Sequence, residues 1–67
     1  MKIGTEIRKA REAMGLTQDA YARRVGLTQQ RVSELEGGAN IGTRTLERLI
    51  KRGGLIWSSK GPRARAA

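Results

Sequence analysis

The sequence predicts a small all-α domain of four to five short helices, followed by a short C-terminal strand. Two observations predict this class. Apolar residues recur three or four positions apart in successive segments between residues 3 and 52, and glycines separate these segments, which is the pattern of short helices that each bury one face. The 67 residues include one Tyr, one Trp and no Phe, so aliphatic side chains must fill the core by close packing. A domain this small is marginally stable alone, and a dimer would help.

A first helix is expected to begin near residue 3 and to end at Gly15, its C-terminal cap. Its inward stripe consists of Ile3, Ile7, Ala10 and Met14. Arg11 lies within this stripe, where an unpaired guanidinium carries a large desolvation cost. Glu36, at the end of the third helix, is the best partner, so we predict a structural ion pair between Arg11 and Glu36. The alternative is that Arg11 extends its guanidinium to solvent.

The second and third helices are expected to be joined by a tight turn at Gly26. Thr17 is the expected N-cap of the second helix, and Thr28 is that of the third. Gly26 ends the second helix, where a left-handed residue costs little, and the glycine pair 37–38 ends the third. The inward positions are Tyr21, Ala22 and Val25 on one helix and Val32 and Leu35 on the other. Two short helices joined in this way are typical of a DNA-binding helix-turn-helix.

A fourth helix is expected to open at Thr43 and to end at the glycine pair 53–54, with Leu46, Leu49 and Ile50 facing inward. We therefore expect the DNA-binding domain to occupy residues 1–54. Residues 55–67 differ in kind, because a short apolar run precedes turn residues and a basic tail. We expect a strand at 55–58 and a disordered tail at 59–67.

The composition points to a polyanionic partner. Fourteen Lys and Arg against six Asp and Glu give a net charge of +8, which favours nucleic acid through counterion release. A membrane surface is the rival interpretation, but no apolar run approaches the roughly 20 residues of a spanning helix, and no signal-peptide core follows Met1. We expect a cytoplasmic, nucleoid-associated protein. Because the chain has neither Cys nor His, thiol chemistry, zinc fingers and imidazole catalysis are excluded, and we expect no enzyme, no metal and no cofactor.

The outer face of the third helix is expected to read DNA bases. At about 100° per residue, Gln30, Ser33 and Glu34 point away from the buried side, and Gln29 lies at the edge. Glutamine can pair with adenine, and a carboxylate can accept from cytosine N4. Any surface helix has a polar face, but the preceding turn favours DNA recognition. Phosphate contacts are expected where helices begin, from Gln18, Thr28, Arg31, Thr43 and Arg44.

These residues resemble the Cro/C1-type (XRE family) helix-turn-helix repressors over residues 3–52. The resemblance implies a lambda-repressor-like fold with Gln29, Gln30 and Glu34 as base readers and Gln18 as a phosphate contact. It also implies the Arg11–Glu36 ion pair. The matching elements are Ile7-Arg8-Lys9-Ala10-Arg11, Gly15-Leu16-Thr17-Gln18, Ala22, Val25-Gly26, Thr28-Gln29-Gln30, Val32-Ser33 and Leu35-Glu36-Gly37-Gly38.

The chain departs from the family pattern after the fourth helix, where a fifth helix is usual. Some members pair through an added C-terminal strand, and Leu55, Ile56 and Trp57 could form such a dimer interface. The alternative is that Trp57 folds back on helices one and four and completes the core. Position 34 also departs, because Glu34 repels phosphates where a neutral amide would read adenine.

Together these patterns predict a homodimeric repressor that binds an inverted-repeat operator in double-stranded DNA and controls its own phage, plasmid or anti-defence operon. Half-sites about 10 bp apart would place the third helix in successive major grooves. One alternative is an antitoxin that neutralises a toxin protein and represses its own operon. Another is a sequence-independent nucleic-acid coat or RNA binder, which the charge alone would allow.

Overall fold

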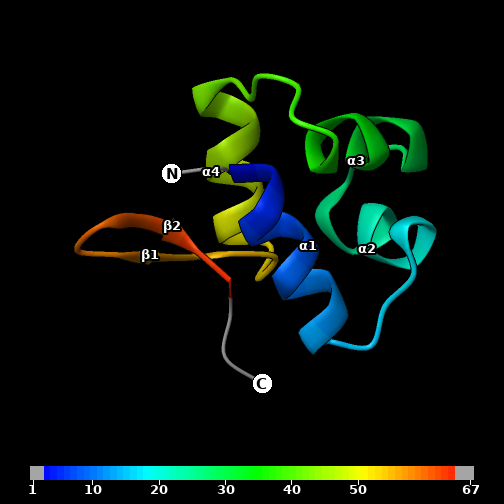
Figure 1. Cartoon of the computed structure of the whole chain (residues 1–67), viewed down its shortest axis with the longest axis horizontal. Coiled ribbons are helices and arrows are strands. Elements are labelled where there is room, and N and C mark those ends of the chain that lie inside the picture. Colours follow the sequence, from blue (N-terminus) through cyan, green and yellow to red (C-terminus); the bar gives the residue numbers. More distant parts are fainter. Residues whose placement is uncertain (1–2, 65–67) are drawn as a thin grey trace.

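The computed structural model describes residues 3–64, which form four helices and a β-hairpin (Figure 1). The elements are α1 (Ile3–Ala13), α2 (Gln18–Val25), α3 (Gln29–Glu36), α4 (Thr43–Lys51), β1 (Ile56–Ser58) and β2 (Gly61–Arg63). The helices confirm the all-α prediction, and the hairpin adds to it. None of the helices in this part of the chain offers the apolar length that crossing a membrane requires.

Threonine and glycine determine the ends of α2 and α3 as predicted. The Thr17 hydroxyl accepts the backbone N–H of Ala20 at 3.1 Å, and the Thr28 hydroxyl accepts that of Arg31 at 3.1 Å. These caps satisfy backbone donors that have no partner within the helix. Gly26 adopts the left-handed conformation (φ 76°) directly after α2, so the chain turns sharply into α3. The two threonine caps thus determine the residues at which α2 and α3 begin.

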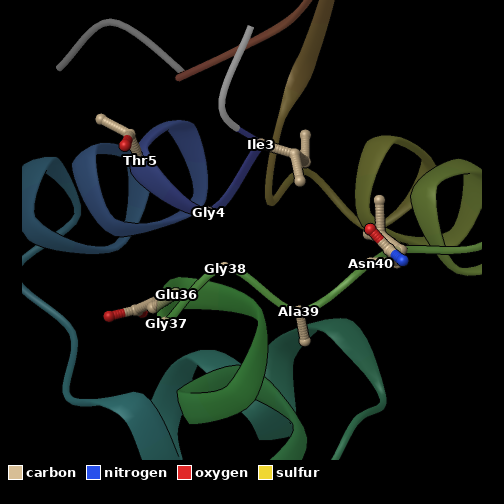
Figure 2. Close-up of a pocket in the computed structure, with 9 residues that line it drawn as sticks. Ile3, Gly4, Thr5, Glu36, Gly37, Gly38, Ala39 and Asn40 are labelled. Carbon is tan, nitrogen blue, oxygen red and sulfur yellow. The ribbon is translucent and has the colours of Figure 1, made fainter.

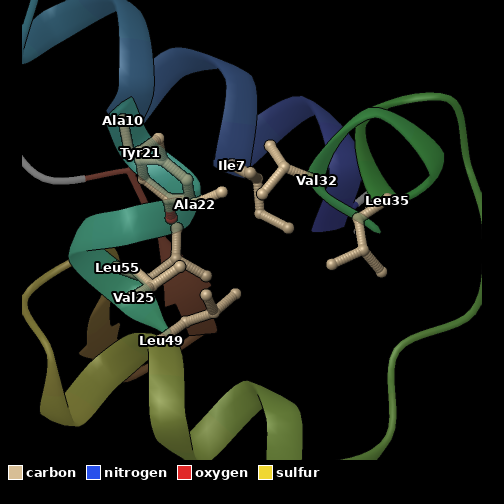
Figure 3. Packing of buried hydrophobic residues seen from close by; sticks show 9 residues of the cluster. All are labelled: Ile7, Ala10, Tyr21, Ala22, Val25, Val32, Leu35, Leu49 and Leu55. Carbon is tan, nitrogen blue, oxygen red and sulfur yellow. The ribbon is translucent and has the colours of Figure 1, made fainter. Parts of the chain in front are cut away.

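The hydrophobic core lies where α1, α2, α3 and α4 converge (Figure 3). Its largest member, Tyr21, is fully buried, and its hydroxyl donates to the carbonyl oxygen of Gly54 at 3.0 Å. Burial, together with the negative charge of Glu36, raises the pKa of Tyr21 to about 12. The buried apolar residues are Ile7, Ala10, Tyr21, Ala22, Val25, Val32, Leu35, Leu49 and Leu55. All except Leu55 lie on the inward faces predicted from the helical periodicity.

α1 and the C-terminal end of α3 approach each other at backbone distance. A Cβ atom on Gly4 would overlap the carbonyl oxygen of Leu35. Beside this contact, the loop 37–41 and the start of α1 enclose an open pocket of 720 Å³ (Figure 2). Gly4, Gly37, Gly38 and Ala39 form part of its wall, and their lack of larger side chains leaves this space unfilled.

The C-terminal segment forms a hairpin, so the predicted disordered tail at 59–67 is wrong for residues 61–63. β1 and β2 pair antiparallel, with Trp57 opposite Pro62 and Ser58 opposite Gly61. Gly61 has a positive φ of 109°, which favours glycine, and the Ser58 hydroxyl donates to its carbonyl oxygen at 2.9 Å. The turn between the two strands lies at residues 59–60, and the Gly-Pro pair that follows it begins β2. Residues 65–67 lie outside the described part of the chain.

The hairpin is anchored to the helices at its base and projects away from them (Figure 1). The backbone N–H of Ala64 donates to the Glu6 carboxylate at 2.8 Å, and Leu55 is buried in the core. In contrast, Trp57 is 64% exposed and Ile56 is 42% exposed. The alternative in which Trp57 folds back on helices one and four is therefore wrong, and it is Leu55 that joins the core.

Candidate nucleic-acid interface

The helix-turn-helix brings together two glutamines that are eleven residues apart in the sequence. Gln18 and Gln29 each follow a threonine N-cap, so each lies at the first residue of its helix. The Gln29 amide Nε2 donates to Gln18 Oε1 at 2.9 Å. This bond joins the N-terminus of α2 to that of α3 and orients Gln29 on the outer surface.

An ion pair between Arg11 and Glu36 lies behind these glutamines. The Arg11 Nε donates to Glu36 Oε2 at 2.7 Å and Nη2 donates to Oε1 at 3.1 Å, while Nη1 donates to the Leu16 carbonyl oxygen at 3.1 Å. The Arg11 and Glu36 side chains are only 15% and 6% exposed, so the alternative in which Arg11 extends to solvent is wrong. Hydrogen bonding to Glu36 raises the pKa of Arg11, against the lowering caused by burial.

The ion pair and the glutamines form one hydrogen-bonded network. The Gln18 Nε2 donates to Glu36 Oε1 at 3.3 Å, on the carboxylate that Arg11 also holds. We call Arg11, Glu36, Gln18 and Gln29 the polar chain. It starts in α1 and ends at the first residue of α3, so it links the ion pair to an exposed side chain.

The other residues predicted to read bases lie on the exposed side of α3. The side chains of Gln30 and Ser33 make no hydrogen bond with any residue between 3 and 64, so their donors and acceptors face solvent. Glu34 is also exposed, and one oxygen lies 3.4 Å from Nη1 of Arg31. Arg31 Nη2 donates to the Asn40 carbonyl oxygen at 3.1 Å. Arg31 thus ties α3 to the loop before α4 and partly neutralises Glu34.

The residues predicted to contact phosphate lie at the beginnings of helices. The Thr28 hydroxyl accepts a backbone N–H and keeps its own proton available for donation. Thr43 and Arg44 are exposed in the first turn of α4, whose N-cap, Gly42, supplies no side-chain hydrogen bond. The first turn of α4 therefore offers backbone donors and a cation to an anion from outside the chain.

Three basic residues of α4 and its C-cap were missed by the sequence interpretation. Arg48 Nη1 donates to the carbonyl oxygen of Gly26 at 3.2 Å, so α4 braces the turn between α2 and α3. Lys51 and Arg52 line the same shallow hollow of 250 Å³ as Arg44 and Arg48. Their helical spacing was visible in the sequence, but their position beside the turn depends on tertiary packing.

Comparison with known proteins agrees with this geometry. The family described as helix-turn-helix matches residues 7–55, which covers most of the chain and all of α2, α3 and α4. No curated protein and no solved structure matches the chain significantly.

Proposed function

Because the chain belongs to the helix-turn-helix family, of the Cro/C1 type, we propose that this DNA-binding regulator is a homodimeric repressor of an inverted-repeat operator. The observation that carries the proposal is the hydrogen bond from Gln29 to Gln18 at 2.9 Å, backed by the Arg11–Glu36 pair. It orients an amide at the first residue of α3. Such orientation favours sequence recognition, because less side-chain freedom is lost on binding.

Gln29 retains the groups that adenine recognition needs. A glutamine amide has two N–H donors and one carbonyl oxygen, and Gln18 accepts only one of these donors. The second N–H and Oε1 can then pair with adenine N7 and N6 in the major groove. Gln30 and Ser33 extend this surface, and Glu34 would accept from cytosine N4. We propose these four side chains as the base readers.

Phosphate contacts would surround this reading face. We propose that Gln18, Thr28, Arg31, Thr43 and Arg44 hold the two strands that border the groove. The support for this assignment is their position, since all five lie at the N-cap or in the first turn of a helix. Such contacts set the register of the protein on DNA and carry no sequence information.

The hairpin would join two copies of the chain. β2 packs against α1, while β1 carries the exposed Ile56 and Trp57. Exposed aromatic and branched side chains on a strand are suited to a second copy of the same strand. The prediction of Leu55 as a third interface residue is wrong, because Leu55 is only 1% exposed and packs in the core at the base of the hairpin. Repression would then respond to the concentration of the protein itself, as in an autoregulated phage, plasmid or anti-defence operon.

The decisive experiment is selection of random duplex DNA at physiological salt, followed by sizing of the protein alone and on its best site. We expect an inverted repeat with half-sites about 10 bp apart and two protomers bound. The variant Trp57→Ser should remain folded and size as a monomer. Tight, salt-sensitive binding without any enriched sequence would instead indicate a nucleic-acid coat protein.

Two substitutions separate base reading from phosphate contact on the selected site. Gln30→Ala should weaken binding at one operator position by about 1–3 kcal/mol and leave arbitrary duplexes unaffected. Arg44→Ala should weaken all sequences alike and lower the salt slope by about one. An equal loss on every sequence from Gln30→Ala would remove Gln30 from the base-reading set.

A further inference from the structure

The helix-turn-helix carries no net charge, so the net positive charge of this chain lies elsewhere. Residues 17–36 contain three basic and three acidic side chains, whereas residues 43–64 contain six basic side chains and a single acidic one. Four of those six, Arg44, Arg48, Lys51 and Arg52, belong to α4 or its C-cap. We call these four residues the α4 basic face.

The α4 basic face is arranged differently from the other charged helix surfaces. On α1 and α2, residues four apart carry opposite charges, as in the pairs Arg8–Glu12 and Asp19–Arg23. On α4, Arg44, Arg48 and Arg52 follow one another at that same spacing, where like charges repel and destabilise a helix. In the described part of the chain, no carboxylate lies within 4 Å of these three guanidinium groups. Apart from the hydrogen bond of Arg48 to the Gly26 carbonyl oxygen, folding gains no contact from these charges, which is the pattern expected of a binding surface.

The packing of the chain puts this face next to the turn that leads into α3. Arg48 Nη1 lies 3.2 Å from the Gly26 carbonyl oxygen, and a Cβ on Gly26 would lie 3.9 Å from the Arg52 guanidinium carbon. Gly26 is two residues before Thr28, the N-cap of α3. If α3 enters the major groove, these cations lie beside its point of entry, where phosphates border the groove.

We infer that the α4 basic face, beyond Arg44, binds the phosphate backbone of DNA and so extends the contact past the segment read by α3. This inference rests on the proposed DNA-binding function. From residue 44 to residue 52 the helix rises about 12 Å, the axial length of roughly three to four phosphates on one strand. Glu47 also lies on this face, but its single negative charge is outnumbered by the four basic residues, so the face keeps a net positive charge. A row of cations about 12 Å long suits an extended polyanion better than a compact ligand.

The test compares two variants that lose the same charge. Lys51→Gln/Arg52→Gln removes two cations from the α4 basic face, and Arg8→Gln/Lys9→Gln removes two exposed cations from α1. Binding of each protein to the selected operator and to an arbitrary duplex, both about 30 bp long, is measured as salt is varied between about 50 and 200 mM. Circular dichroism confirms that each variant is folded. If the double variant does not fold, Lys51→Gln alone replaces it.

The α4 variant should lower the slope of log K against log salt by about 1.8 on both duplexes, at about 0.9 per phosphate contact. When salt rises from about 50 to 200 mM, the factor by which its affinity falls should then be about 12-fold smaller than the factor for the wild type. Its preference for the operator should not change, and the α1 variant should behave as the wild type. A slope equal to that of the wild type or of the α1 variant overturns the inference.

Two further outcomes are informative. If the wild type itself shows no salt-dependent binding to either duplex, the proposed function fails, and this inference fails with it. If the α4 variant keeps the wild-type slope on DNA but loses binding to polyglutamate, the face binds an acidic polypeptide, which overturns the assignment to DNA. The wild-type result therefore tests the function, and the difference between the variants tests the α4 basic face.

Discussion

The ion pair between Arg11 and Glu36 offers the sharpest test of how the core supports the interface. We consider Arg11→Met, Glu36→Leu and the double variant, which replace the charged groups with apolar side chains of similar size. Each single substitution leaves one charged group nearly buried, because the wild-type side chains are 15% and 6% exposed. The double substitution leaves neither charge.

The expected magnitudes follow from this burial. Removing one partner of a buried pair costs about 3–5 kcal/mol, whereas replacing both with apolar residues is often neutral. A chain of 67 residues has a free energy of unfolding of about 3–10 kcal/mol. Each single variant should therefore lose between about a third and all of its stability. The double variant should stay within about 2 kcal/mol of the wild type, since only the Leu16 carbonyl and Gln18 amide lose bonds that water can partly replace.

Urea unfolding followed by circular dichroism, at one fixed protein concentration, measures all four proteins of this double-mutant cycle. We expect a coupling free energy of at least about 3 kcal/mol. The folded double variant should also bind the operator more weakly, because Gln18 no longer donates to Glu36. Single variants that each cost less than about 1 kcal/mol, the value of an exposed ion pair, would show that the pair does not stabilise the fold.

Two other predictions concern the core. Tyr21→Phe should cost about 1–3 kcal/mol, because the buried Gly54 carbonyl loses its donor. Since burial raises the pKa of Tyr21 from an unfolded value near 10 to about 12, wild-type stability should fall as the pH rises from about 10 to 12, and unfolding of Tyr21→Phe at each pH should show a smaller fall. Gly4→Ala should lower stability by about 1–3 kcal/mol in urea unfolding, because its Cβ overlaps α3. Gly42→Ala, where a Cβ meets open space, is the control and should change little.

The local signals in the sequence predicted the helices well. Thr17 and Thr28 cap α2 and α3, and Gly26 supplies the left-handed turn, because these effects act between residues only a few positions apart. The inward faces of the helices followed from the period of the apolar residues, and Leu49 is fully buried as that period predicts. The hairpin was missed at β2, since pairing across a turn depends on the Ser58 and Gly61 contacts rather than on apolar periodicity.

The sequence by itself therefore determined the helix-turn-helix, its glutamine-rich surface and its family, because capping, helical period and side-chain chemistry are properties of short segments. Tertiary structure alone decided how that surface is supported. The bond from Gln18 to Glu36 and the contact of Arg48 with Gly26 join segments that are distant in the sequence. The exposure of Trp57 depends on which side chains the core leaves uncovered. Such features follow from the packing of the whole chain, in which Leu55 fills the core and Trp57 remains at the surface.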